Sequence, residues 1–283
     1  MKLDPITAAT LSSQIQNALA EDIGTGDLTA ALIPADKQMA GRVIARESGV
    51  LAGCAWFDEV FRQVDPAVEI NWLAQDGDQL TDNQPLCTLK GPARALLTGE
   101  RTALNFIQLL SAVASRTQTY VNAVSDSNCK ILDTRKTIPG LRLAQKYAVL
   151  CGGGKNHRIG LFDAVLIKEN HIASAGSISA AVTQARQNSA AANQQVMVEV
   201  EVEDLAELDQ AISAGADRIL LDNFSLTNLS MAVKTNAGKC ELEASGGITL
   251  KTIGPIANTG VDFISVGELT KTIDALDLSM RLN

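Results

Sequence analysis

Short apolar runs alternate with helical patterns in the second half of the chain, from about residue 128 onwards. Each run has the length and composition of a buried strand, and most of the stretches between them carry the period of a helix. The six runs are KILDT (130–134), AVLIK (164–168), VMVEVEV (196–202), RILLD (218–222), CELEAS (240–245) and FISVG (263–267). The last four are centred about 21 to 23 residues apart, which is the length of one strand, one helix and two short loops. This repeat predicts a parallel sheet with right-handed crossovers, and we expect a barrel-like but incomplete α/β domain because six units fall short of eight.

The first 115 residues have a mixed pattern of helical and strand-like stretches. The elements predicted here are a helix near 7–20, strands at 41–46 and 67–73, and a long helix over 93–124. We therefore predict two domains, an N-terminal α/β domain over residues 1–115 and a barrel domain over residues 116–283. As an alternative for the extreme C-terminus, we consider that it packs back on the first domain.

Polar residues follow every one of the six apolar runs, at the position where a strand would end. In βα barrels the active site lies at the carboxyl ends of the strands, so these residues are expected to meet at a single polar mouth. They are Asp133, Thr134, Arg135, Lys136, Lys168, Glu169, Asn170, His171, Glu201, Asp222, Asn223, Ser245, Gly246, Gly247 and Gly267.

Basic residues gather between positions 130 and 171, although the chain as a whole is acidic. This segment holds eight lysines and arginines and three acids, a balance of +5 (8 − 3) in a chain whose net charge is -8. It also holds both histidines, His157 and His171. A solvated basic face is the ordinary explanation of such a segment, but here the basic residues lie at strand ends and in the loops after them. The pattern therefore favours a pocket for a polyanionic substrate.

Composition excludes several other classes of protein. The acidic net charge argues against nucleic-acid binding, because phosphate contacts need clustered lysine and arginine. The five cysteines are odd in number and include no C-x-x-C pair, which indicates reduced thiols in a cytoplasmic protein rather than a zinc site or disulfide framework. The start of the chain lacks the apolar core of a signal peptide, and no apolar run approaches the ~18 residues of a membrane span.

Two glycine turns follow the last two runs, SGGI (245–248) and SVGE (265–268). Barrels commonly bind a phosphate group at this place through backbone N–H groups and a helix N-terminus, so we expect a phosphate site; plain turn chemistry is the alternative. The sequence GGGK (152–155) is no phosphate loop of the G-x-x-x-x-G-K type, because that motif would need glycine where Val149 stands.

Three acids are candidates for the centre of the predicted mouth. Glu199 and Glu201 are two residues apart on one strand and therefore share a face. Glu201 and Asp222 end adjacent strands and could hold magnesium, a hard cation that prefers oxygen ligands. A salt bridge to a nearby lysine is the competing interpretation. Lys168 has a rival interpretation too, because class I aldolases place a Schiff-base lysine at the end of a barrel strand.

Several long segments resemble the quinolinate phosphoribosyltransferase family, and together they cover nearly the whole chain. They are EDIGTGDLT (21–29), GERTALNFIQLLS (99–111), DTRKTIPGLR (133–142), KYAVLCGGGKNHRIGLFDAVLIKENHI (146–172), VEVEVE (198–203), LLDNF (220–224) and SGGI (245–248). The resemblance implies an N-terminal α/β sandwich domain and a C-terminal open, seven-stranded α/β barrel. It implies a pentosyltransferase that joins quinolinate to phosphoribosyl pyrophosphate with loss of carbon dioxide, giving nicotinate mononucleotide and pyrophosphate for NAD biosynthesis.

The resemblance also implies roles for individual residues. Substrate binding falls to Arg101, Thr134, Arg135, Lys136, His157, Arg158 and Lys168, with Arg101 expected to come from the loop region before the long helix and to enter the site from the partner subunit of a homodimer. Catalysis falls to Lys168, Glu201 and Asp222, with Glu201 and Asp222 holding a magnesium ion bound with phosphoribosyl pyrophosphate. The 5′-phosphate is expected at Ser245, Gly246, Gly247 and Gly267. No organic cofactor is expected. Glu268, beside the second turn, departs from the family pattern by placing an acid there.

Three rival functions remain open on sequence grounds. The nearest is a phosphoribosyltransferase for a related acid such as nicotinate, or a paralogue attached to metal-uptake functions. Nicotinate has one carboxylate, which needs fewer cations than this pocket offers. A Schiff-base lyase using Lys168 belongs to another class and would be trapped covalently by borohydride. A sugar-phosphate sensor would show no turnover.

Overall fold

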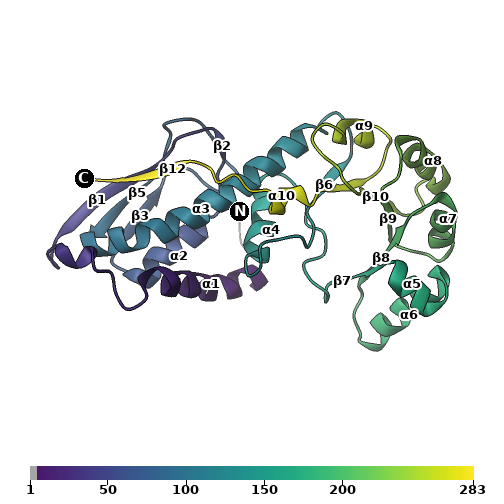
Figure 1. The fold of residues 1–283 in the computed structure, drawn as a ribbon, viewed down its shortest axis with the longest axis horizontal. Coiled ribbons are helices and arrows are strands. Elements are labelled where there is room, and N and C mark those ends of the chain that lie inside the picture. The colour runs from purple at the N-terminus through teal and green to yellow at the C-terminus, as the bar shows by residue number, and fades with distance from the viewer. Residues whose placement is uncertain (1–4) are drawn as a thin grey trace. The chain divides into compact units, whose positions relative to one another are not determined.

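Two units make up the part of the chain that the computed structural model describes, residues 5–283 (Figure 1). The first unit contains the chain up to Gln118 together with Thr137–Gly153 and Leu269–Asn283, and the second contains Thr119–Lys136 and Gly154–Glu268. Residues 1–4, on which part of the prediction about a signal peptide rests, lie outside the described part. No helix among residues 5–283 is long and apolar enough to cross a membrane.

The second unit is built on a parallel sheet of six strands in the order β6-β11-β10-β9-β8-β7. The strands are β6 (Lys130–Leu132), β7 (Ala164–Ile167), β8 (Met197–Val202), β9 (Arg218–Asp222), β10 (Glu241–Ser245) and β11 (Phe263–Ser265). Each coincides with one of the six predicted apolar runs. Helices follow the strands and lie along the outer side of the curved sheet: α5 (Glu169–Ala175), α6 (Ile178–Ala191), α7 (Leu205–Ser213), α8 (Leu226–Asn236) and α9 (Ile253–Ala257) (Figure 1). The predicted alternation of strand and helix is confirmed.

Side-chain caps begin three of these helices. Ser177, Asp204 and Ser225 each accept a hydrogen bond from a backbone N–H in the first turn of the helix that follows. Such caps satisfy N–H groups that have no partner inside the helix, and they fix the residue at which the chain turns away from the sheet.

The sheet has six strands rather than the seven that the family resemblance implies. Lys155 takes the place of the missing strand as a single parallel bridge to β6, donating its N–H to Ile131 and accepting that of Asp133. These two bonds are at 2.8 and 3.1 Å and lie on the side of β6 away from β11. The seventh strand is therefore reduced to one residue, and closure of the sheet into a barrel is not seen among the described residues.

The first unit combines an antiparallel sheet with helices. Its four strands run in the order β12 (Leu278–Leu282), β1 (Gln38–Ala45), β5 (Pro85–Pro92) and β3 (Glu69–Trp72), and β2 (Gly49–Val50) pairs separately with β4 (Gln79–Leu80). Its helical segments are α1 (Pro5–Ile23), the short 3-10 turn Ala30–Leu32, α2 (Cys54–Val64), most of α3 (Ala93–Asn122), α4 (Arg142–Cys151) and most of α10 (Glu268–Lys271). The C-terminal strand β12 belongs to this unit because it pairs with β1.

Residues 137–153 also belong to the first unit, whereas the predicted boundary assigns the whole of 116–283 to the barrel domain. Helix α4 explains the difference. The centre of the Tyr147 ring lies 5.4 Å from that of Trp56 with the rings tilted by 42°, and the Tyr147 hydroxyl donates a 2.7 Å hydrogen bond to Asp76. At the end of α4 a Cβ on Gly152 would lie 2.3 Å from the carbonyl oxygen of Ala114, so only glycine allows this close approach to α3.

Candidate active site

A pocket of about 510 Å³ lies at the carboxyl ends of the six parallel strands. Every strand, or the loop directly after it, contributes a lining residue, which is the arrangement expected for the mouth of a βα barrel. The predicted site residues that meet here are Thr134, Arg135, Lys136, His157, Arg158, Lys168, Glu201, Asp222 and Ser245. The pocket is further lined by Leu166, Leu220, Glu243 and Ser265.

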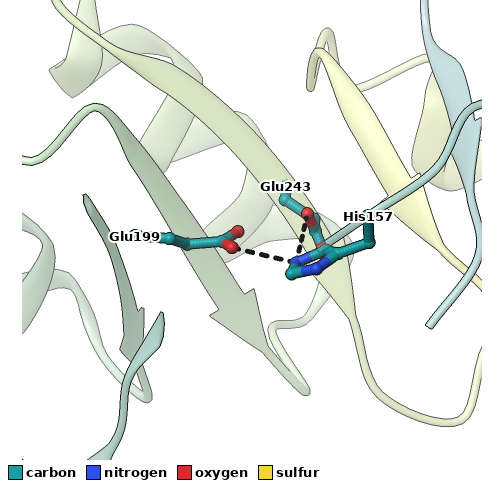
Figure 2. Close-up of side chains that lie close together, drawn as sticks. All are labelled: His157, Glu199 and Glu243. Atoms are coloured by element: carbon teal, nitrogen blue, oxygen red, sulfur yellow. Dashed lines mark ion pairs between the residues drawn. The ribbon is translucent and has the colours of Figure 1, made fainter. Parts of the chain in front are cut away.

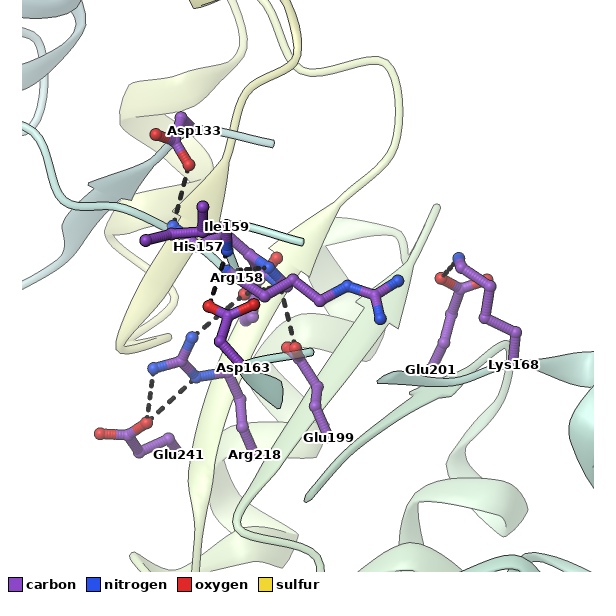
Figure 3. A network of polar contacts seen from close by, with 11 residues as sticks. Asp133, His157, Arg158, Ile159, Asp163, Lys168, Glu199, Glu201, Arg218 and Glu241 are labelled. Carbon is purple, nitrogen blue, oxygen red and sulfur yellow. Dashed lines mark hydrogen bonds and ion pairs between the residues drawn. The ribbon is translucent and has the colours of Figure 1, made fainter. Parts of the chain in front are cut away.

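Two acids, Asp133 and Asp163, hold the loop that carries His157 and Arg158 (Figure 3). Asp133, fully buried at the end of β6, accepts the backbone N–H of His157 at 2.9 Å and the side-chain amide of Asn156 at 2.6 Å. Asp163 accepts the N–H groups of residues 159 and 160 at 2.7 and 2.8 Å. The loop is therefore fixed on both sides of Arg158.

Two guanidinium groups raise the positive potential of the pocket. Burial lowers the pKa of Arg158, and the like charge of Arg135 lowers it further. The Nε atom of Arg135 is buried and has no hydrogen-bond partner among the described residues. Two like charges with an unused donor are stabilised by an anion, and a guanidinium offers a carboxylate two parallel hydrogen bonds.

Lys168 and Glu201 form an ion pair across the mouth (Figure 3). The pair is half-exposed, with 41% of the Lys168 side chain and 19% of the Glu201 side chain accessible. This is the salt bridge that stood as the alternative to a metal role for Glu201. Lys168 is thus engaged by a carboxylate, rather than lying in an apolar pocket or beside another cation, the settings that activate a Schiff-base lysine. Asp222, on the neighbouring strand, accepts a 2.8 Å hydrogen bond from the side chain of Asn223.

The first glycine turn has a conformation that only glycine adopts easily. Gly246 has φ 101°, and a Cβ there would lie 2.1 Å from the side-chain oxygen of Asn223. Gly247 has φ 58°, and a Cβ on Gly267 would lie 3.0 Å from the Lys136 side chain. The turns therefore lie beside the pocket.

The helices after these turns are short or delayed. Helix α9 begins at Ile253, several residues after the first turn, and α10 covers only Glu268–Lys271. The sequence predicted a helix N-terminus beside each turn; one begins directly after Gly267 but has only four residues, and among the described residues none begins directly after Gly247. Glu268 is engaged elsewhere, because the buried hydroxyl of Tyr120 donates to its carboxylate.

A second polar layer lies beneath the pocket, formed by His157, Glu199 and Glu243 (Figure 2). His157 is 8% exposed, and both glutamates are fully buried. The Nε2 atom of His157 lies 2.9 Å from a carboxylate oxygen of Glu199 and 3.5 Å from one of Glu243. None of the four carboxylate oxygens accepts a well-aligned hydrogen bond. Burial, followed by the charge of Glu199, raises the pKa of Glu243 to about 8, and burial also raises that of Glu199.

Arg218 supplies positive charge to this layer. Its guanidinium lies 4.1 Å from the centre of the Phe263 ring, binds Glu241 at 2.7 Å, and lies 3.6 Å from Glu243. Sequence reasoning found Glu199 by its two-residue spacing from Glu201 but overlooked Glu243, although Glu243 and Ser245 have the same spacing on β10. Asp133 was counted as a strand-end residue without a role.

Arg101 is the predicted site residue that lies in the other unit. It is exposed, and it lies within helix α3 rather than in a loop before it, so that part of the expectation is wrong. Strand β5 ends at Pro92, and helix α3 continues without interruption from Ala93 to Asn122. Arg101 therefore lies in the third turn of the helix.

Both halves of the chain match models of one known family. Residues 27–111 match the model of the quinolinate phosphoribosyl transferase N-terminal domain, and residues 113–281 match that of the C-terminal domain. A probable nicotinate-nucleotide pyrophosphorylase [carboxylating] of Bacillus subtilis is 44% identical over 270 residues, covering 95% of this chain and 92% of the relative. A chloroplastic nicotinate-nucleotide pyrophosphorylase [carboxylating] of Arabidopsis thaliana is 41% identical, covering 96% and 83%.

A solved structure extends the match to three dimensions. The nicotinate-nucleotide pyrophosphorylase of Francisella tularensis is 50% identical, with a TM-score of 0.94, and the match covers 97% of this chain and 96% of that one. Both domain models and these close relatives span the two units, so the chain belongs to the quinolinate phosphoribosyltransferase family.

Proposed function

We propose that this chain transfers the phosphoribosyl group of phosphoribosyl pyrophosphate to quinolinate with decarboxylation, giving nicotinate mononucleotide, pyrophosphate and carbon dioxide. Membership of the family supports the reaction, since relatives are named quinolinate phosphoribosyltransferase [decarboxylating]. The observation that carries the proposal is the pairing of Arg135 and Arg158 in one pocket with Lys136 and Lys168. Two adjacent carboxylates on a small ring need this density of cationic donors.

Arg135, Arg158 and Lys168 are the proposed ligands of the two quinolinate carboxylates. The buried, unpartnered Nε of Arg135 supports its part in this set. His157 is not included, because both of its ring nitrogens face protein atoms. Thr134 and Lys136, which line the same pocket, are proposed to contact phosphoribosyl pyrophosphate, and Ser245, Gly246, Gly247 and Gly267 its 5′-phosphate.

The chemistry follows from the charges at the mouth. The bond from the ribose carbon to pyrophosphate breaks as the ring nitrogen of quinolinate bonds to that carbon, and Glu201 and Asp222 offer negative charge to the oxocarbenium-like centre. Lysine side chains offset the charge of the departing pyrophosphate. The ribosylated ring nitrogen is cationic and accepts the electron pair left when carbon dioxide departs. A proton then takes the place of the lost carboxylate on the ring carbon.

Glu201 and Asp222 also fit a magnesium ion brought in by phosphoribosyl pyrophosphate. They end the adjacent strands β8 and β9, line the same pocket, and offer the oxygen ligands that this cation prefers. Glu201 would exchange or share its contact with Lys168. When bound, the ion supplies charge stabilisation for the pyrophosphate oxygens.

A homodimer is proposed to complete the site, with Arg101 donated by the partner subunit; a higher assembly is compatible with it. The family resemblance and the exposed position of Arg101 on α3 support this. A cytoplasmic location is proposed as well, supported by five free cysteines that form no disulfide among the described residues. The acidic net charge of -8 supports a protein without a nucleic-acid partner.

The first prediction concerns the choice of substrate. Quinolinate is expected to turn over far faster than nicotinate, because Arg135 and Arg158 together match two carboxylates and one of them would be left uncompensated by nicotinate. Steady-state rates with each acid, at equal magnesium and phosphoribosyl pyrophosphate, test this. Equal rates for the two acids would contradict it.

The second prediction concerns the metal. Asp222→Asn is expected to reduce kcat/KM by roughly 10²-fold or more, the scale for removing one charge at a reacting centre, and the wild type is expected to lose activity in a chelator. Asp222→Glu is the matched comparison, because it keeps a carboxylate at this position. Full activity of the wild-type protein in excess chelator would refute the metal role.

The third prediction concerns Arg101. Arg101→Ala and Arg135→Ala are each expected to lose roughly 10²–10⁴-fold in kcat/KM. Mixing the two variants under conditions of subunit exchange is expected to restore about a quarter of wild-type activity, because half of the dimers are mixed and each has one intact site of two. If exchange is proven, for example by mass spectrometry, and no activity returns, Arg101 acts within its own subunit or only in folding.

A further inference from the structure

His157 has both ring nitrogens directed at the protein rather than at the pocket. Its Nδ1 accepts the backbone N–H of Arg158 at 2.7 Å, and its Nε2 lies 2.9 Å from Glu199. A neutral imidazole has one donor and one acceptor nitrogen. Because Nδ1 accepts a hydrogen bond, the ring proton must lie on Nε2, where the buried carboxylate of Glu199 faces it (Figure 2).

We propose that His157 is a positioning residue: the carboxylate of Glu199, 2.9 Å from Nε2, favours the ring proton on that atom by its charge, and the lone pair on Nδ1 then accepts the backbone N–H of Arg158 and so fixes the place at which that guanidinium enters the pocket. Glu199, which the reaction itself does not use, thereby acquires a role in substrate binding. This inference deepens the proposed function, and its effect on quinolinate binding rests on that function; the position of the ring proton does not.

The surroundings of the ring support a fixed orientation. Asp133 accepts the backbone N–H of His157, and Asp163 closes the turn directly after Arg158, so the peptide between the two residues is restrained on both sides. Only 7% of the imidazole side chain is accessible. In other proteins, too, the partner of one imidazole nitrogen decides which nitrogen carries the proton.

A buried metal site is the alternative for the same three side chains. One ligand atom from each of His157, Glu199 and Glu243 lies within 4.8 Å of the others. The cluster is, however, already supplied with positive charge, since Arg218 lies 3.6 Å from Glu243 and the charge of Arg158 acts on Glu199. A divalent cation would add positive charge where two guanidinium groups already act on the two glutamates.

Nitrogen NMR of the labelled ring tests the proton position directly. The chain has only two histidines, so the spectrum of His171→Gln identifies the signals of His157 by subtraction. The expected pattern is an unprotonated, pyridine-type Nδ1 and a protonated, pyrrole-type Nε2, retained when quinolinate is added. A protonated Nδ1, or an imidazolium that forms when quinolinate binds, would overturn the proposal. About one tightly bound transition-metal ion per chain, lost in Glu243→Gln, would overturn it as well.

A matched pair of variants tests the consequence for binding. His157→Asn places an amide oxygen near the position of Nδ1, whereas His157→Gln places its amide near that of Nε2. Calorimetric titration is expected to show quinolinate affinity reduced roughly tenfold or more in His157→Gln and much less in His157→Asn, with both variants checked for folding by thermal denaturation. The reverse order would show a ligand contact through Nε2 and overturn the proposal. If the wild type binds no quinolinate, the proposed function fails, and the ring-proton pattern still decides the positioning role.

Discussion

Two guanidinium groups, those of Arg135 and Arg158, are held in one partly buried pocket, where burial and the charge of Arg135 disfavour the charge of Arg158. Such an arrangement costs free energy unless negative charge lies nearby. Glu199, Asp163 and Glu201 supply part of that negative charge at Arg158, and the mouth of the pocket is left for an anionic ligand. The parallel sheet brings these groups together, because alternate residues of a strand point to the same side of the sheet. On β8 and on β10, one such residue lies in an inner layer and the next lies in an outer layer at the mouth.

The two layers have different tasks. The outer layer, with Lys168, Glu201 and Asp222, is half-exposed and can exchange its ion pairs for contacts with substrate. The inner layer is almost wholly buried at the floor of the pocket, so its charges act as fixed supports. Strand register connects them: Glu199 and Glu201 are neighbours on one face of β8, and Glu243 and Ser245 on one face of β10.

The sequence predicted the features that depend on periodicity. Strand positions, the single mouth and the shared face of Glu199 and Glu201 all follow from spacing along the chain. Spacing does not say which core a helix joins, so the assignment of residues 137–153 to the first unit required the contacts of Tyr147 and Gly152. Spacing also does not predict that a single parallel bridge at Lys155 stands in place of the expected seventh strand. The pairing of Lys168 with Glu201 was one of two open alternatives, since both interpretations place the same residues at adjacent strand ends.

The central claim is that the cationic mouth binds a ring with two carboxylates and releases one of them only after the ring nitrogen has been ribosylated. Quinolinate labelled with ¹³C in the carboxylate beside the ring nitrogen tests it most directly. With magnesium and phosphoribosyl pyrophosphate, one labelled carbon dioxide is expected for each nicotinate mononucleotide formed, and none is expected when phosphoribosyl pyrophosphate is left out. Labelled carbon dioxide released without phosphoribosyl pyrophosphate, or a nucleotide product that keeps both carboxylates, would contradict the account.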